Sequence, residues 1–423
     1  MKTLPSLGRF LCFAFTLFAF TLSSHAQVKK GYVAHEWGTF TSLQASDGTL
    51  LTWNAGAPTD LPNFVYNWKM PGAGRLPAGM LALNKGTAAL QRMETPVVYL
   101  YGNGGESVDL TVRFPKGTIT EWYPHAADVG PSYIRVANDD GSETNVSNLE
   151  SMIRWRATIL SKGESATTKL PVEKSDNHYF AARETDAALL MVSGPNQARY
   201  SEFEKFLFYR GIGNFSTPLI VTGEGAKITV SNTGTEPLKH LFVYTVRNGK
   251  GQFVPIEQLA PGEEKTIEFS AKSEPLKKLV TQISRDLIAS LRKEGLYEPE
   301  ARAMVKTWKS SWFEEEGTRV LYTLPEKWTE EILPITLDPQ PRELVRVMVG
   351  RAELIRPDTE REIIGLLTEA KDQQRDVSRE IGRLLKPYGR FGHPIYMRAL
   401  SKVDPTYQTP ELWKLYSMNP ATK

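Results

Sequence analysis

Four short strand-like segments between residues 206 and 269, aromatic, apolar or alternating in pattern, limit the possible fold more than any other feature. The segments are residues 206–209, 226–230, 241–246 and 266–269. Turns rich in Gly, Asn and Pro separate them. Short segments with a period of two, interrupted in this way, are typical of an antiparallel β-sandwich. The pattern therefore predicts an Ig-like β-sandwich over residues 196–271.

Further strands are expected on the N-terminal side of this sandwich. Residues 33–42, 96–101, 108–114, 119–123, 153–159 and 180–192 are apolar or alternating in pattern. Residues 46–92 are instead rich in Gly, Pro and Asn, and an irregular excursion of this length inside a domain tends to be functional. We therefore expect an N-terminal β domain over residues 27–195.

The period changes from two to 3.6 near residue 273. Apolar residues from Leu276 to Leu291 form one helical stripe, and a second helix is expected from Pro299. Residues 319–324, 332–337 and 344–355 favour strands, and a long helix is expected from Asp358 to Leu384. The prediction is a mainly β protein, in which antiparallel β-sandwich domains precede a C-terminal helical and mixed α/β region over residues 272–423.

Residues 1–26 have the features of a signal peptide. Lys2 and Arg9 precede an apolar run from Phe10 to Leu22, which is short for a membrane span. Ser24 and Ala26 provide the small residues that a signal peptidase needs for cleavage. The only cysteine, Cys12, lies within this segment, so the mature chain would have none. An exported chain of this size without disulfides is expected in a bacterial periplasm or in the medium.

The charge balance of the mature chain excludes some partners. Removing residues 1–26 leaves 49 basic and 48 acidic residues. A balance this close to neutral gives no general attraction to nucleic acid, and no second long apolar run predicts a membrane span. A protein or polysaccharide of the cell envelope is a more suitable partner. Scattered aromatics in residues 53–68 could form a platform for it, or could equally hold an irregular loop together.

Three histidines have polar neighbours on predicted strands. His35 precedes Glu36, His125 follows Glu121, and His178 would share a face with Glu184 if residues 178–186 were extended. Neutral imidazoles from three strands could bind a divalent transition metal such as zinc, copper or iron. The alternative is that each is a hydrogen-bonded histidine at a strand end, because no spacing typical of a metal motif is present.

Several acids lie in or beside apolar strands, where an unpaired carboxylate is costly. Glu36, Glu94 and Glu184 are the candidates for general acid/base hydrolysis if they face one cleft. The structural alternative is salt bridging, for example to Arg183 and Arg210.

A third feature is the run from Trp308 to Arg319, where three glutamates at a helix end oppose the helix dipole. The simpler interpretation of that run is a solvated acidic turn with Trp308 and Trp312 in the core.

Several motifs together resemble a family of secreted bacterial proteins for which no function is known. They are His35 to Thr41 (HEWGTFT), Met93 to Val97, Ala182 to Ala187, Lys205 to Gly211 and Trp308 to Arg319. The resemblance covers most of residues 31–356 and implies export, but it implies no cofactor, substrate or catalytic role.

Two functional hypotheses follow. The first is a noncatalytic extracytoplasmic binding or scaffold protein. The second is a periplasmic hydrolase, with or without a metal ion, whose site would gather His35, Glu36, Glu94, His125, His178 and Glu184.

Overall fold

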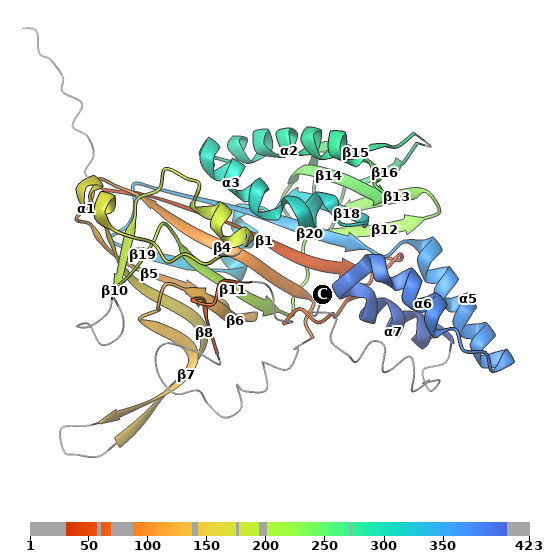
Figure 1. Cartoon of the computed structure of the whole chain (residues 1–423), viewed down its shortest axis with the longest axis horizontal. Helices are drawn as coiled ribbons and strands as arrows, with labels where there is room; N and C mark the ends of the chain where they lie inside the picture. The colour runs from red at the N-terminus through yellow and green to blue at the C-terminus, as the bar shows by residue number, and fades with distance from the viewer. Residues whose placement is uncertain are drawn as a thin grey trace, which may run out of the picture. The chain divides into compact units, whose positions relative to one another are not determined.

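A large mixed sheet runs through the computed structural model and provides the surface on which all other layers pack (Figure 1). The structure describes residues 31–56, 61–68, 88–137, 143–174, 177–193, 201–270 and 272–403. The predicted signal peptide and residues 404–423 lie outside the described residues. Within these residues, the sheet has eleven strands. Its strands, in spatial order, are β17 (Glu274–Pro275), β15 (Lys250–Leu259), β14 (Leu238–Arg247), β18 (Gly317–Thr323), β20 (Glu343–Leu354), β1 (Val33–Gln44), β4 (Gln91–Tyr101), β11 (Leu207–Gly213), β6 (Gly117–Tyr123) and β3 (Tyr66–Asn67), with β2 (Leu50–Leu51) on β1.

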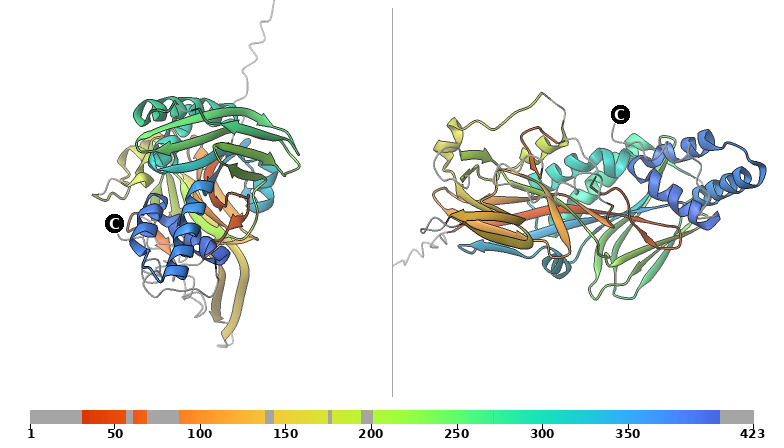
Figure 2. Two further views of the ribbon diagram at one scale, coloured as in Figure 1. Left: turned by 90° about the vertical axis from the view of Figure 1, so that its right-hand side faces the viewer. Right: turned by 90° about the horizontal axis from the view of Figure 1, so that it is seen from below.

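Two smaller sheets cover one face of the large sheet (Figure 2). The first contains β10 (Ser201–Glu204), β9 (Leu190–Ser193), β8 (Glu143–Ile159), β5 (Ser107–Arg113) and β19 (Ile335–Asp338), with β7 (Asp128–Ala137) on β8. The second contains β12 (Leu219–Glu224), β13 (Lys227–Asn232) and β16 (Glu264–Glu268). Side chains from all three sheets meet in one core, including Phe40 of β1, Trp155 of β8 and Val230 of β13.

Most helices lie on the other face, whereas α4 (Glu326–Ile332) packs with the two small sheets through Trp328 and Ile332. In chain order the helical segments are α1 (Lys162–Thr167), η2 (His178–Arg183), α2 (Leu276–Lys293), α3 (Glu298–Lys309), the π-helical turn η3 (Ser310–Glu314), α4 (Glu326–Ile332), α5 (Pro357–Gln373), α6 (Ser378–Leu385), η4 (Lys386–Phe391) and α7 (Gly392–Val403). Two separate cores lie under them. Trp37 joins a core with α2 and α3, and Leu43, six residues later on β1, joins a core with α5 to α7. No helix in the described residues is long and apolar enough to cross a membrane.

The predicted fold class is confirmed, because the protein is mainly β with a helical region at its C-terminal end. The predicted boundaries at residues 195 and 271 do not separate independent parts. β4, β11 and β20 come from the three predicted domains and belong to one sheet, and the chain from Gly31 onward forms one unit. One strand pair also departs from the antiparallel prediction, since β1 and β20 are parallel over their whole length.

Two local predictions are wrong for identifiable reasons. Residues 178–183 form a 3₁₀ helix rather than a strand, because the Asn177 side chain accepts a hydrogen bond from the Tyr179 N–H and caps the turn. The long helix from residue 358 to 384 is divided. α5 ends at Gln373, the backbone of the following Gln374 is left-handed, and α6 starts at Ser378. The apolar stripe continues across the break because both helices pack on the same core.

Candidate functional site

His35 and Glu36 point to opposite faces of β1, as a strand requires. His35 is buried under α3, where its Nδ1 lies 2.7 Å from Glu300 Oε2. Glu300 also accepts the Tyr297 N–H at 2.8 Å and so completes the capping box of α3. The other ring nitrogen of His35 has no partner among the described residues. The pair therefore attaches α3 to the central strand.

Glu300 was not among the predicted site residues. The signal that could have identified it is its place three residues after Tyr297 at the start of a predicted helix. A carboxylate at that position commonly reaches back to the helix start. Its second partner, His35, is 265 residues away in the sequence, so no local pattern indicates the contact.

Glu36 belongs to a buried ion pair on the opposite face. It accepts hydrogen bonds from Arg346 Nε at 2.7 Å and from the Tyr209 hydroxyl at 2.5 Å. Burial and the neighbouring Glu36 raise the pKa of Tyr209 well above its ordinary value, so the phenol stays protonated. The guanidinium of Arg346 also donates to the Leu333 carbonyl. With its charge satisfied by two donors, Glu36 is a structural carboxylate and not a free base.

Glu94 lies in a cluster of buried charges. Burial alone would raise its pKa, but Arg390, Arg92, Arg210 and Arg351 more than offset this and lower the pKa to about 2. The Arg390 Nη1 and Glu94 Oε1 atoms are 3.0 Å apart. This oxygen accepts no well-aligned hydrogen bond from a described residue, so we treat the contact as an ion pair. Glu94 is thus ionised at neutral pH and is shared by several cations.

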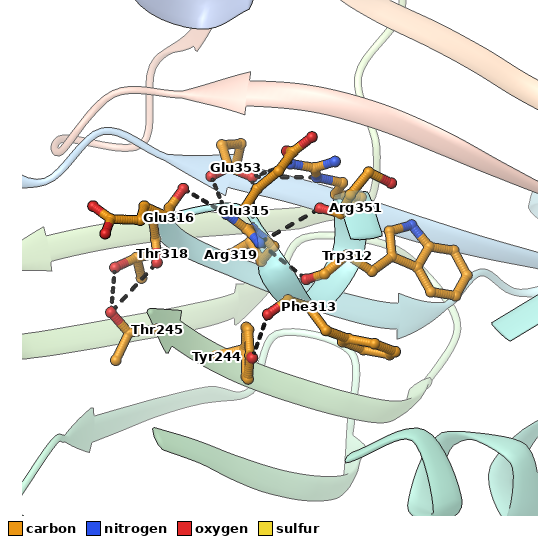
Figure 3. Close-up of polar contacts among 12 residues, drawn as sticks. Tyr244, Thr245, Trp312, Phe313, Glu315, Glu316, Thr318, Arg319, Arg351 and Glu353 are labelled. Carbon is orange, nitrogen blue, oxygen red and sulfur yellow. Dashed lines mark hydrogen bonds and ion pairs between the residues drawn. The ribbon is translucent and has the colours of Figure 1, made fainter. Parts of the chain in front are cut away.

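The acidic turn after α3 belongs to the same cluster (Figure 3). Glu353 accepts two hydrogen bonds from Arg319, at 3.0 and 3.1 Å, and two from Arg351, at 3.2 and 3.0 Å. Arg351 also donates to Glu315 at 2.7 Å. Arg319 further donates to backbone carbonyls of Trp312 and Glu316. The prediction that Trp308 and Trp312 are core residues is confirmed, but the turn is held by buried arginines and is not merely solvated.

The remaining predicted residues lie in three different surroundings. Glu184 is exposed and pairs with Lys306 at 2.5 Å. The His125 backbone N–H donates to Glu202 at 2.7 Å, and its ring packs edge-on against Tyr66. The His178 ring packs beside Trp308.

No three His, Cys, Asp or Glu side chains among the described residues are grouped so that they could hold a metal ion. The structure therefore does not assemble His35, His125 and His178 into a metal site.

Salt bridging accounts for the predicted acids, although mostly with other partners than expected. Arg183 pairs with Glu204 at 2.6 Å, and Arg210 faces Glu121 in the register of β11 and β6. Of the two alternatives for the aromatics of residues 53–68, the described part favours the one in which they hold an irregular segment together. Trp53 and Trp68 are buried, and Phe64 packs against Tyr123 and Tyr179. These rings hold the irregular segment to the body of the protein.

The described surface has several hollows, of which two lie beside the helical segments. The larger is a groove of about 1350 Å³ between α2 and α3. The smaller is a cavity of about 590 Å³ between residues 51–54 and the segment formed by η4 and α7. Of the six residues predicted for a hydrolase site, only Glu184 lines either of them.

Comparisons with known proteins add no function. No family model matches the sequence, and no curated protein matches it. Solved structures with some similarity include the yeast delta-COP-I mu-homology domain, alone and in complex with a Dsl1 WxWxV peptide. Each is 8% identical and matches over 77% of this chain and 98% of the other, with TM-scores of 0.28 and 0.29. Likeness at this level carries no argument about this protein.

Proposed function

We propose that this protein is a noncatalytic binding protein of the cell envelope, and that the groove between α2 and α3 receives an acidic, apolar-faced segment of a protein partner. The observation that carries the proposal is the groove itself, which has an apolar floor and a mainly basic rim. The place of action rests on the signal-peptide features of residues 1–26 and stays a prediction.

The floor of the groove suits an apolar side of a peptide. Val280 and Ala303 are buried at its base, and Leu276 and Ile288 are half-buried along α2. Each square ångström of apolar surface covered there contributes roughly 25 cal/mol. Two packed helices with an open seam are a common receptor for an amphipathic helix, whose apolar residues recur every three to four positions.

The rim of the groove determines the charge of the partner. Five basic side chains line it, namely Lys277, Arg285, Arg302, Lys306 and Lys309. Three carboxylates accompany them, and these form ion pairs with rim cations: Glu298 with Arg302, Glu184 with Lys306 and Glu314 with Lys309. The lining residues carry an excess of two positive charges, of which the charge on Arg285 is shared with Asp286 beside the groove. This excess favours an acidic partner, because complementary charge accelerates and orients association.

The hydrolase hypothesis has weaker support. Its residues are divided between the two faces of β1, the buried charge cluster and the exposed surface, so they do not share a cleft among the described residues. Most of these side chains are engaged in ion pairs or ring packing. A binding function needs only the groove, which is present.

The test is a selection of displayed peptides against the mature protein. We expect enriched sequences with Asp or Glu on one side and apolar residues at helical spacing on the other. Binding of one enriched peptide is then measured by fluorescence anisotropy with two variants. Ser284→Trp fills the groove from α2, whereas Gln282→Trp places the same ring on an exposed position of α2 that does not line it.

The expected result is that Gln282→Trp binds like the natural protein and Ser284→Trp binds at least about tenfold more weakly, which corresponds to about 1.4 kcal/mol. Equal binding by both variants would place the peptide elsewhere. A selection that enriches no acidic amphipathic sequence would contradict the proposed function.

A further inference from the structure

The smaller cavity, beside η4 and α7, has a different chemistry from the groove. Its lining comes from residues 51–54, from Ala88 and from the segment formed by η4 and α7. We propose that this cavity binds a small organic anion whose carboxylate or phosphate group lies against Arg390 and Arg398. The inference is independent of the groove and goes beyond the proposed function.

Three lining residues on the helical side of the cavity lie in one line. His393, Met397 and Ser401 follow one another at four-residue steps along α7, which places them on one face of the helix. Trp53 and Asn54 lie opposite and belong to the irregular excursion whose length already suggested a function. Both walls are therefore formed by segments that converge here from distant parts of the sequence.

The two arginines are held in place from behind. Arg390 reaches Glu94 at 3.0 Å, and its guanidinium lies over the Trp53 ring, 5.0 Å from the ring centre. Arg398 donates to Glu360 at 2.8 Å and to Asp47 at 2.5 Å. Side chains fixed in this way lose little freedom when a ligand binds, so more of the contact energy appears as affinity.

The positive charge that remains for an anion lies mainly on Arg390, because Arg398 pairs with both Glu360 and Asp47. A guanidinium has five N–H donors, and the contacts above use only part of them. Glu94, the carboxylate that pairs with Arg390, also interacts with Arg92, Arg210 and Arg351. It therefore does not neutralise the charge of Arg390 alone. The lining of the cavity contains no carboxylate of its own. A planar carboxylate or a phosphate matches the forked geometry of arginine.

The other lining groups fit an organic body attached to the anion. Half-burial lowers the pKa of His393, so its ring is neutral at pH 7 and can donate one hydrogen bond to a ligand oxygen. Leu51, Pro394 and Met397 supply apolar contact. A volume of about 590 Å³ lies within the usual range for small-molecule sites.

The experiment compares two matched substitutions at one half-buried lining position. Met397→Glu places a carboxylate in the cavity, and Met397→Gln places a neutral side chain of the same size there. Inorganic phosphate and succinate are titrated by isothermal calorimetry into the full mature chain at constant ionic strength. We expect saturable binding of at least one anion by the natural protein and by Met397→Gln, and dissociation constants at least about tenfold higher for Met397→Glu.

The preferred probe identifies the chemistry, since phosphate and succinate represent the two possible anionic groups. If neither anion binds saturably, or if both variants bind alike, the site is refuted. Should Met397→Glu fail to fold, as judged by circular dichroism, the exposed pair Ser401→Asp and Ser401→Asn repeats the comparison at the far end of the same face.

Discussion

At the scale of the single residue, Gly38 is the position where β1 passes the irregular part of β4. The register between these strands shifts between Trp37 and Thr39, and Thr95 adopts a positive φ of 48°. A Cβ atom on Gly38 would lie 2.9 Å from the Pro96 Cα, which is backbone and cannot turn aside. Gly38→Ala should therefore lower the free energy of unfolding by about 1–3 kcal/mol, measured by equilibrium urea denaturation.

Gly163→Ala is the matched control, because nothing lies within 4 Å of a Cβ built at this exposed helical position. We expect it to leave stability unchanged or slightly higher. Equal losses in both variants would mean that the close approach to Pro96 is not the cause. Both HEWGTFT and Met93 to Val97 could be picked out in the sequence, but their contact could not, because it depends on strand register.

At the scale of the element, a band of charges separates the two helical cores along one face of the large sheet. Thr41 of β1 pairs in register with Arg92 of β4 on one side and Arg351 of β20 on the other. This row lies between Trp37 and Leu43, which belong to different cores. Arg390 of η4 extends the band toward the helices by its ion pair with Glu94. The band thus connects the sheet to both groups of helices.

Glu94→Gln tests the energetic role of this band. The pKa of Glu94 is lowered from 4.5 to about 2, so its ionised form contributes stability that is complete above pH 4.5 and is lost as the pH falls toward 2. Removing the charge should cost about 3 kcal/mol at pH 7, because several buried cations lose a counter-ion. The difference from the natural protein should shrink between pH 4.5 and 2 in urea denaturation series.

Glu298→Gln provides the comparison for that measurement, since Glu298 pairs with Arg302 on the surface of α3. An exposed pair of this kind is screened by water, so its loss should hardly change the urea midpoint at any pH. A pH-independent deficit in Glu94→Gln would show that lost packing, and not lost charge, destabilises the protein. That glutamates in apolar strands need cationic partners was predictable from burial cost alone. The identity of the arginines that pair with these glutamates could not be predicted from the sequence.

At the scale of the whole molecule, the sequence patterns identify elements better than they identify domains. The helices at residues 276–293 and 298–309 and the strand at residues 343–354 match their predicted periods closely. The boundaries near residues 195 and 271 fail because alternation shows which side chains share a face, but not which strand lies next to which. β1 and β20 pair in parallel although about 310 residues separate partners such as Trp37 and Val347.

This connectivity predicts that the chain cannot be divided at residue 271. In a fragment of residues 31–270, β1 would lose its parallel partner β20, and β14 would lose β18. The core beneath α2 and α3 would also be exposed, including Trp37 and Phe242. We expect the fragment to show no cooperative unfolding transition, whereas the mature chain unfolds in one transition seen alike by tryptophan fluorescence and far-ultraviolet circular dichroism.

Adding residues 272–403 as a separate chain should restore part of the signal, because it supplies the missing central strands. A fragment that unfolds cooperatively by itself would mean that the first 270 residues hold a self-sufficient core, and that the large sheet is assembled from two stable halves.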